Sequence, residues 1–248
     1  MDKNVQFRQI VLATDGKSNV GMDPVVTAEE IHKKGITIST IGIIEGNELE
    51  QPIAEVENIS TAGGGVSEVT DVVNLSVTME LVTQRSIYKT IEHAVNKELR
   101  EILGTDLNHA HPETRKKITE VIDRFGEEAT VKCCIVIDCS GSMAKKINIA
   151  KNSIINLLRV MKARKGKTEI CVIGFPGKNG EHYSMLCDFT QDLIELEMGL
   201  QKIKIGGTTP TASALQYAAK ILLNEKNEFE VEDKGEFIEN PILKDNIV

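Results

Sequence analysis

The sequence contains no tryptophan and few other aromatic residues, with three tyrosines and six phenylalanines among 248 residues. Its hydrophobic content is nevertheless 41%, so the core must be built mainly from aliphatic side chains. A chain of this length can hold one α/β domain of ordinary size, with room for an insert or a tail. We therefore expect a globular protein with an aliphatic core.

Features of membrane, secreted and disulfide-rich proteins are also missing. The longest apolar stretches have the length of a strand, well below the roughly 18 residues of a membrane span. The N-terminal segment MDKNVQFRQ lacks the apolar stretch of a signal peptide. The five cysteines show neither zinc-site spacing nor a disulfide pattern, which indicates buried, reduced thiols. We expect a cytoplasmic protein with no membrane partner.

The chain has no excess of positive charge. Its net charge of −8 argues against nucleic acid as the principal partner. Much of this charge lies in residues 225–248, where eight acidic residues face three lysines. This segment has little apolar periodicity, and we expect a mostly disordered tail.

Strand-like and helix-like segments alternate along most of the chain. We expect strands over residues 10–13, 36–44, 66–70, 131–137, 169–175 and 183–189. We expect helices over residues 24–34, 48–61, 145–163, 193–203 and 211–223, and a further helix from about residue 74. This alternation predicts βαβ units, while the short turn before 183–189 makes that last strand antiparallel to its neighbour. The expected fold class is α/β, doubly wound, with a mostly parallel sheet and one antiparallel edge strand.

Residues 86–128 interrupt the alternation with long, charged helical segments. A second helix begins at Pro112, and residues 105–110 form the turn between the two. This pattern predicts a helical hairpin that leaves the domain and returns to nearly the same place.

Two of the predicted strands end in an aspartate, Asp15 and Asp138. In an open parallel sheet, ligands bind beyond the carboxyl ends of the strands, where the crossovers leave toward opposite faces. If these strands are neighbours, their carboxylates converge there, beside Ser140, Ser142 and the Thr208 loop. Carboxylate and hydroxyl oxygens are hard ligands that suit Mg²⁺ or Mn²⁺.

These residues resemble the metal-ion-dependent adhesion site of the von Willebrand factor A (VWA) domain family. The D-x-S-x-S motif corresponds to Asp138, Ser140 and Ser142. The threonine in a glycine-rich loop corresponds to Thr208, and the aspartate of a T-D-G turn to Asp15. The chain is also similar to VWA proteins of spore-forming Gram-positive bacteria.

The order of the motifs departs from the family, because the T-D-G turn comes first here. Residues 131–223 resemble the first half of a VWA domain and residues 8–84 the second half, as in a circular permutant. We expect four segments: 1–85, the second half; 86–130, a hairpin connector; 131–224, the first half; and 225–248, the tail. A domain-swapped dimer, in which each half completes the partner's other half, is the alternative to a permuted monomer.

The resemblance implies a function as well as a fold. In the family, a divalent cation at this site takes a further ligand from a Glu or Asp carboxylate of a binding partner. Ser140, Ser142 and Thr208 would be direct ligands, and Asp138 and Asp15 would act directly or through water. The chain would then be a protein-binding module and not an enzyme.

Other interpretations of these residues are possible. The two serines could cap the helix that follows. The protein could be a metal-dependent hydrolase or a VWA subunit of an ATP-driven, chelatase-like assembly, but no general base, His-bearing triad or nucleotide loop lies near the site in sequence. Cys139 is a poor candidate nucleophile because its sequence neighbours include an acid and no histidine. A metal that only stabilises the junction of the two halves is a third possibility.

Overall fold

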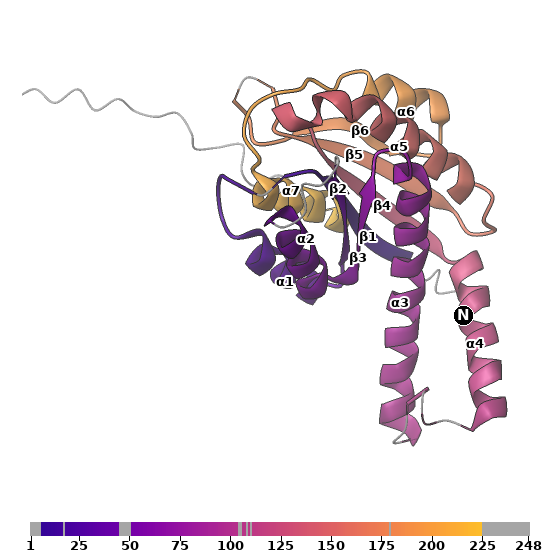
Figure 1. The fold of residues 1–248 in the computed structure, drawn as a ribbon. Helices are drawn as coiled ribbons and strands as arrows, with labels where there is room; N and C mark the ends of the chain where they lie inside the picture. Colours follow the sequence, from indigo (N-terminus) through magenta and orange to yellow (C-terminus); the bar gives the residue numbers. More distant parts are fainter. Residues whose placement is uncertain are drawn as a thin grey trace, which may run out of the picture.

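The computed structural model describes residues 6–16, 18–44, 51–103, 106–107, 109, 111–178 and 180–224. Its strands form one six-stranded sheet in the order β3-β2-β1-β4-β5-β6 (Figure 1). The strands are β1 (Gln6–Thr14), β2 (Thr37–Ile44), β3 (Gly64–Asp71), β4 (Thr130–Asp138), β5 (Thr168–Phe175) and β6 (Ser184–Thr190). Adjacent strands are parallel except β5 and β6, which are antiparallel. The predicted fold class is confirmed.

The helices alternate with the strands along most of the chain, as predicted, and the last two follow β6. They are α1 (Pro24–Lys33), α2 (Gln51–Ala62), α3 (Leu75–Leu103), α4 (Pro112–Glu128), α5 (Ile147–Met161), α6 (Leu193–Leu200) and α7 (Thr211–Leu223). The helix predicted over 145–163 differs, because a 3₁₀ helix, η1 (Gly141–Lys145), precedes α5. The start of the helix predicted over 48–61 and the tail 225–248 lie outside the described residues.

Helices cover both faces of the sheet. On one face, α3, α5 and α6 pack against side chains that include Ile135 and Ile137 of β4. On the other face, α1, α2 and α7 share a core with Cys134 and Val136 of the same strand. Successive side chains of a strand point to opposite faces, so a central strand covered on both sides must be apolar throughout. This requirement explains the unbroken apolar run in β4.

The direction of the crossovers changes between β1 and β4. The chain leaves β1 for α1 on one face, and leaves β4 for η1 and α5 on the other. The two strands are parallel neighbours, so their carboxyl ends lie together at this point. Such a switch point is where doubly wound sheets bind ligands.

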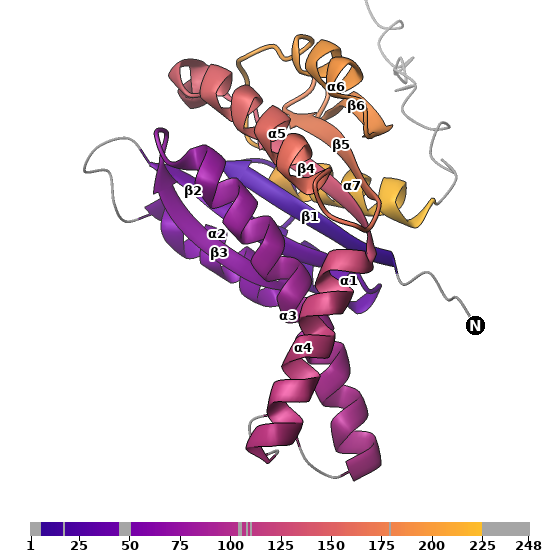
Figure 2. The same cartoon turned by 90° about the vertical axis from the view of Figure 1, so that its right-hand side faces the viewer.

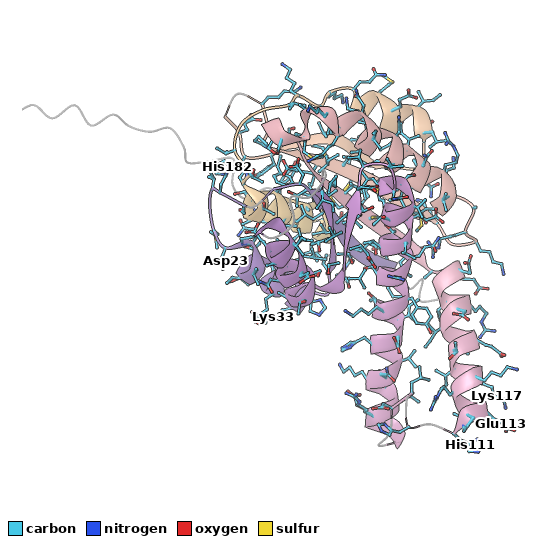
Figure 3. All side chains as sticks on the ribbon, in the orientation of Figure 1. Asp23, Lys33, His111, Glu113, Lys117 and His182 are labelled. Atoms are coloured by element: carbon cyan, nitrogen blue, oxygen red, sulfur yellow. The ribbon has the colours of Figure 1, made fainter. Side chains whose placement is uncertain are left out.

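Helices α3 and α4 form an arm that projects beyond the sheet (Figures 1 and 2). Helix α3 is continuous from Leu75 to Leu103, so the predicted boundary between residues 85 and 86 falls inside it. The Arg164 guanidinium fixes the base of the arm by donating to the carbonyl oxygens of Gly126 and Ala129. Exposed polar side chains, including Glu113 and Lys117, cover α4 near the tip (Figure 3).

None of the described helices is long and apolar enough to cross a membrane. This finding agrees with the short apolar runs in the sequence.

Because the core covers both faces of the sheet, replacing a buried isoleucine should lower the free energy of unfolding far more than replacing an exposed one. Ile135 on β4 is fully buried, so Ile135→Ala should lower the free energy of unfolding by about 2–5 kcal/mol. Ile194 on α6 is 69% exposed, and Ile194→Ala should change that free energy by about 0.5 kcal/mol or less. Urea denaturation of the two variants measures the difference, and similar losses would contradict the burial of β4.

Candidate metal centre

The ends of β1 and β4 are joined by a hydrogen bond between side chains. The register places Ala13 opposite Ile137, so Thr14 lies beside Asp138. The Thr14 hydroxyl donates to Asp138 Oδ2 over 2.6 Å, across 124 positions of sequence. The predicted convergence of the two strand ends is therefore present.

Asp138 is buried as a whole residue, whereas Asp15 is half-buried although its side chain is covered. The backbone amide of Ser140 donates to Asp138 Oδ1 over 2.8 Å. Burial raises the pKa of Asp138, while the hydrogen bonds from Thr14 and Ser140 partly oppose that rise. No ion pair among the described residues involves Asp138, so its charge is met only by hydrogen bonds there.

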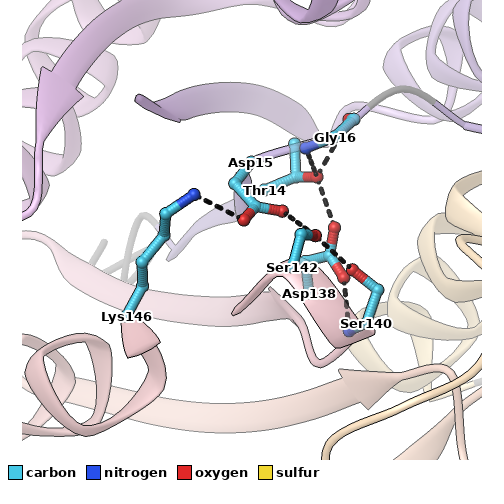
Figure 4. Close-up of polar contacts among 7 residues, drawn as sticks. All are labelled: Thr14, Asp15, Gly16, Asp138, Ser140, Ser142 and Lys146. Carbon is cyan, nitrogen blue, oxygen red and sulfur yellow. Dashed lines mark hydrogen bonds and ion pairs between the residues drawn. The ribbon is translucent and has the colours of Figure 1, made fainter. Parts of the chain in front are cut away.

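The two serines connect Asp138 to Asp15 (Figure 4). Ser142 Oγ donates to Asp15 Oδ1 over 2.7 Å, and lies 3.1 Å from Ser140 Oγ. Because the Ser142 hydroxyl hydrogen is used on Asp15, Ser140 must donate to Ser142. Four of the five predicted site residues thus form one continuous group.

The serine hydroxyls do not cap the following helix. Ser140 occupies the N-cap position of η1, yet its side chain makes no capping hydrogen bond. The hydroxyls point to each other and to Asp15 instead. The capping interpretation of the two serines is therefore wrong.

Thr208 stands apart from this group. Its loop is held against both strand ends: the Gly206 amide donates to Cys139 O over 2.9 Å, and the Thr209 amide donates to Asn19 Oδ1 over 2.8 Å. Thr208 itself is exposed, and no hydrogen bond found in the described part of the chain joins it to the two aspartates or the two serines. The predicted loop therefore lies beside the two strand ends, but Thr208 is not hydrogen-bonded to the group formed by the two aspartates and two serines among the described residues.

Glycine at position 207 is required by the packing of this loop. Its φ of 88° lies in the left-handed region, and a Cβ there would come within 2.9 Å of Pro176 Cγ. The loop therefore follows its path beside Pro176, the residue directly after β5, only with glycine at this position.

The sequence analysis missed Lys146. Its Nζ donates to Asp15 Oδ2 over 2.7 Å, and the exposed fractions of the two side chains are 8% and 0%. Figure 4 shows the lysine reaching Asp15 from the side opposite the serines. The only signal in the sequence is that Lys146 directly precedes the buried Ile147 at the start of an amphipathic helix.

The donor set suits a hard divalent cation. It offers carboxylate and hydroxyl oxygens from two neighbouring strand ends, which is the chemistry of Mg²⁺ and Mn²⁺ sites. Across the residues that the structure describes, no group of three or more His, Cys, Asp or Glu side chains could hold a metal. A centre here would need the serine hydroxyls as well as Asp15 and Asp138.

A doubly wound domain with D-x-S-x-S at its switch point has the architecture of a von Willebrand factor type A domain. The sequence model of the von Willebrand factor type A domain family matches residues 133–234 of this chain. The chain is 37% identical over 218 residues to the uncharacterized protein YabS of Bacillus subtilis strain 168, covering 87% of this chain and 89% of that protein. The chain therefore belongs to the same family as YabS, and its residues 133–234 match the von Willebrand factor type A domain family.

One solved structure has the same fold over most of its length. An uncharacterized protein from Alicyclobacillus acidocaldarius superposes with a TM-score of 0.81 at 32% identity, over 88% of this chain and 94% of that one. Proximal thread matrix protein 1 of the mussel byssus, solved with zinc in its MIDAS motif, is 17% identical, covering 91% of this chain and 48% of that one, with a TM-score of 0.32. A likeness at that level supports no conclusion about this chain.

The contact between Thr14 and Asp138 leads to a stability prediction. Thr14→Val keeps the shape of the side chain but removes the donor to a buried carboxylate, so it should lower the free energy of unfolding by about 1–3 kcal/mol. Thr14→Ser keeps the hydroxyl and should lose less. Urea denaturation in EDTA measures both, and an equal loss in the two variants would contradict a stabilising role of the hydrogen bond.

Proposed function

We propose that the chain is a divalent-metal-dependent, adhesion-type protein-binding module. Asp15, Asp138, Ser140, Ser142 and Thr208 would hold Mg²⁺ or Mn²⁺, and the partner would supply an Asp or Glu carboxylate. Domains of this family typically mediate metal-dependent protein interactions. The observation that carries the proposal is the continuous set of contacts from Asp138 through Ser140 and Ser142 to Asp15.

The chemistry of the site follows from its donors. A bound cation would supply an electrophilic centre that accepts an anionic oxygen. Asp15 and Asp138 would neutralise it, while uncharged hydroxyls would complete its protein ligands without removing its attraction for a carboxylate. Thr208 would complete the ligands from the loop that hydrogen bonds hold against both strand ends, where its side chain is exposed.

A binding role is favoured over catalysis by the surroundings of the site. Burial raises the pKa of Cys139 to about 12, so its thiol stays protonated at neutral pH and is a poor nucleophile. The described hydrogen bonds of the two aspartates and two serines include no histidine that could act as a general base. A VWA subunit of a larger enzyme assembly would use the same metal-dependent contact.

Two further expectations from the sequence stay predictions: that the protein is cytoplasmic and that it is linked to spore formation.

The order of the strands supports a circular permutation of the family's usual chain. The match of the domain model begins at residue 133, at the strand that carries D-x-S-x-S, although other strands precede it in the sequence. Strand β1, with the T-D-G turn, pairs with β4 within the same chain. We propose a permuted monomer in which the α3–α4 arm connects the two halves.

Metal binding tests the proposed centre. Asp15→Asn and Asp138→Asn should each weaken Mn²⁺ binding at least about tenfold, because both carboxylates serve one ion although they are far apart in sequence. Calorimetric titration of the wild type and both variants measures the affinities. Asp123→Asn, which removes an exposed carboxylate on α4, is the matched control and should bind as the wild type does. Full affinity in either site variant would contradict a shared centre.

Partner binding tests the function. Immobilised protein should retain a partner with Mn²⁺ and lose it with EDTA or on Asp138→Asn, provided that the variant stays folded by circular dichroism. Replacing one acidic residue of that partner should abolish retention in the same way, because its carboxylate would complete the metal's ligands. A metal that raises the melting temperature without any metal-dependent partner would favour the structural role instead.

A further inference from the structure

Lys146 places a buried positive charge at the candidate centre. Its side chain is 8% exposed, while its neighbour Lys145 in η1 lies in solvent. Burying an ammonium group is unfavourable unless a negative group pairs with it. The partner is Asp15, whose side chain is fully buried and whose Oδ2 accepts from Lys146 over 2.7 Å. The fold therefore forces this pair together away from water.

Both oxygens of Asp15 are already occupied by donors of the chain. Oδ1 accepts from Ser142, and Oδ2 accepts from Lys146. A divalent cation that uses Asp15 must replace one of these donors or bind close to the ammonium group. Two cations near one carboxylate repel each other, and low solvent exposure strengthens that repulsion. Lys146 therefore opposes metal binding at the residue that the metal needs.

Lys146 also changes the net charge of the centre. With Lys146 beside them, the two carboxylates leave one net negative charge, which a divalent cation would turn into one net positive charge. A carboxylate from a partner would then neutralise the loaded centre. Without Lys146, the loaded centre would already be neutral and would attract an acidic partner less strongly.

We propose that Lys146 is a resident cation that competes with the metal for Asp15. It stabilises the metal-free centre, lowers its metal affinity, and leaves the loaded centre positive for an acidic partner. This inference rests on the proposed metal-dependent function, because it concerns the same site. It differs from a purely positioning role, in which Lys146 would hold Asp15 ready for the metal and its removal would weaken binding.

Removal of the ammonium group tests the competition. Lys146→Met keeps much of the side-chain length without the charge and should tighten Mn²⁺ binding about tenfold or more in calorimetric titration. Lys146→Gln keeps a hydrogen-bond donor without the charge and should also tighten it, which provides a second variant if methionine disturbs folding. Lys145→Met removes a neighbouring exposed lysine and should leave the affinity unchanged.

A measurement without metal tests the pair itself. In EDTA, Lys146→Met should lower the melting temperature, because it leaves Asp15 buried and unpaired. Adding Asp15→Asn to Lys146→Met should recover part of the loss, since the two residues interact directly. Additive effects of the two substitutions would show that the pair does not stabilise the metal-free centre and would overturn the inference.

The outcomes separate this inference from the proposed function. Tighter Mn²⁺ binding in Lys146→Met, or saturable binding in that variant alone, supports the competition. If the wild type binds Mn²⁺ and both Lys146 variants bind it with the same or lower affinity, the competition is overturned and the metal-dependent function stands. Absence of binding in the wild type and in both Lys146 variants overturns the proposed function, and the competition with it.

Discussion

The parallel pairing of β1 with β4 is the constraint on which the site depends. It places Thr14 against Asp138 and Asp15 within reach of Ser142, although 124 and 127 positions of sequence separate the members of these two pairs. The pairing also sets the switch point, because the crossovers after the two strands leave toward opposite faces. A shift in register by one residue would turn every side chain of one strand to the other face and separate the two carboxylates.

The sequence predicted the sheet and most of the site because both have strong local signals. Apolar runs of strand length mark β4 and β5. The D-x-S-x-S motif is compact, so the two contacts within it, from the Ser140 amide to Asp138 and between the hydroxyls of Ser140 and Ser142, need no long-range information. The continuity of α3 was harder to predict, since its first turns face the sheet and its later turns form the arm. Lys146 was missed because a lysine near a helix start is usually solvated. Its ion-pair partner within the described ranges is the distant Asp15, which makes its burial favourable.

Two buried carboxylates at one sheet edge need compensation in the metal-free protein. The described part of the chain supplies it unequally. Asp138 accepts hydrogen bonds from Thr14 and the Ser140 amide and has no ion pair there, whereas Asp15 accepts from the Ser142 hydroxyl and from the Lys146 ammonium group. Burial raises the pKa of Asp138, and the hydrogen bonds from these neutral donors oppose that rise only in part. The two acids therefore differ in role. The charge of Asp138 has no positive partner among the described residues and would be compensated by an added cation, whereas the charge of Asp15 is already compensated by Lys146.

The arm lies where it does not obstruct this edge. Helix α4 ends at Glu128, directly before β4 begins at Thr130, so the arm leaves from the amino end of that strand. Asp138 and the serines lie at its carboxyl end, and Figure 1 shows the arm projecting from one end of the sheet only. A connection from β3 to β4 that crossed the carboxyl edge would have covered the candidate centre. The observed route through α3 and α4 leaves that edge to η1, which carries Ser142, and to the segments that carry Asp15 and Thr208, which is the arrangement that a binding surface requires.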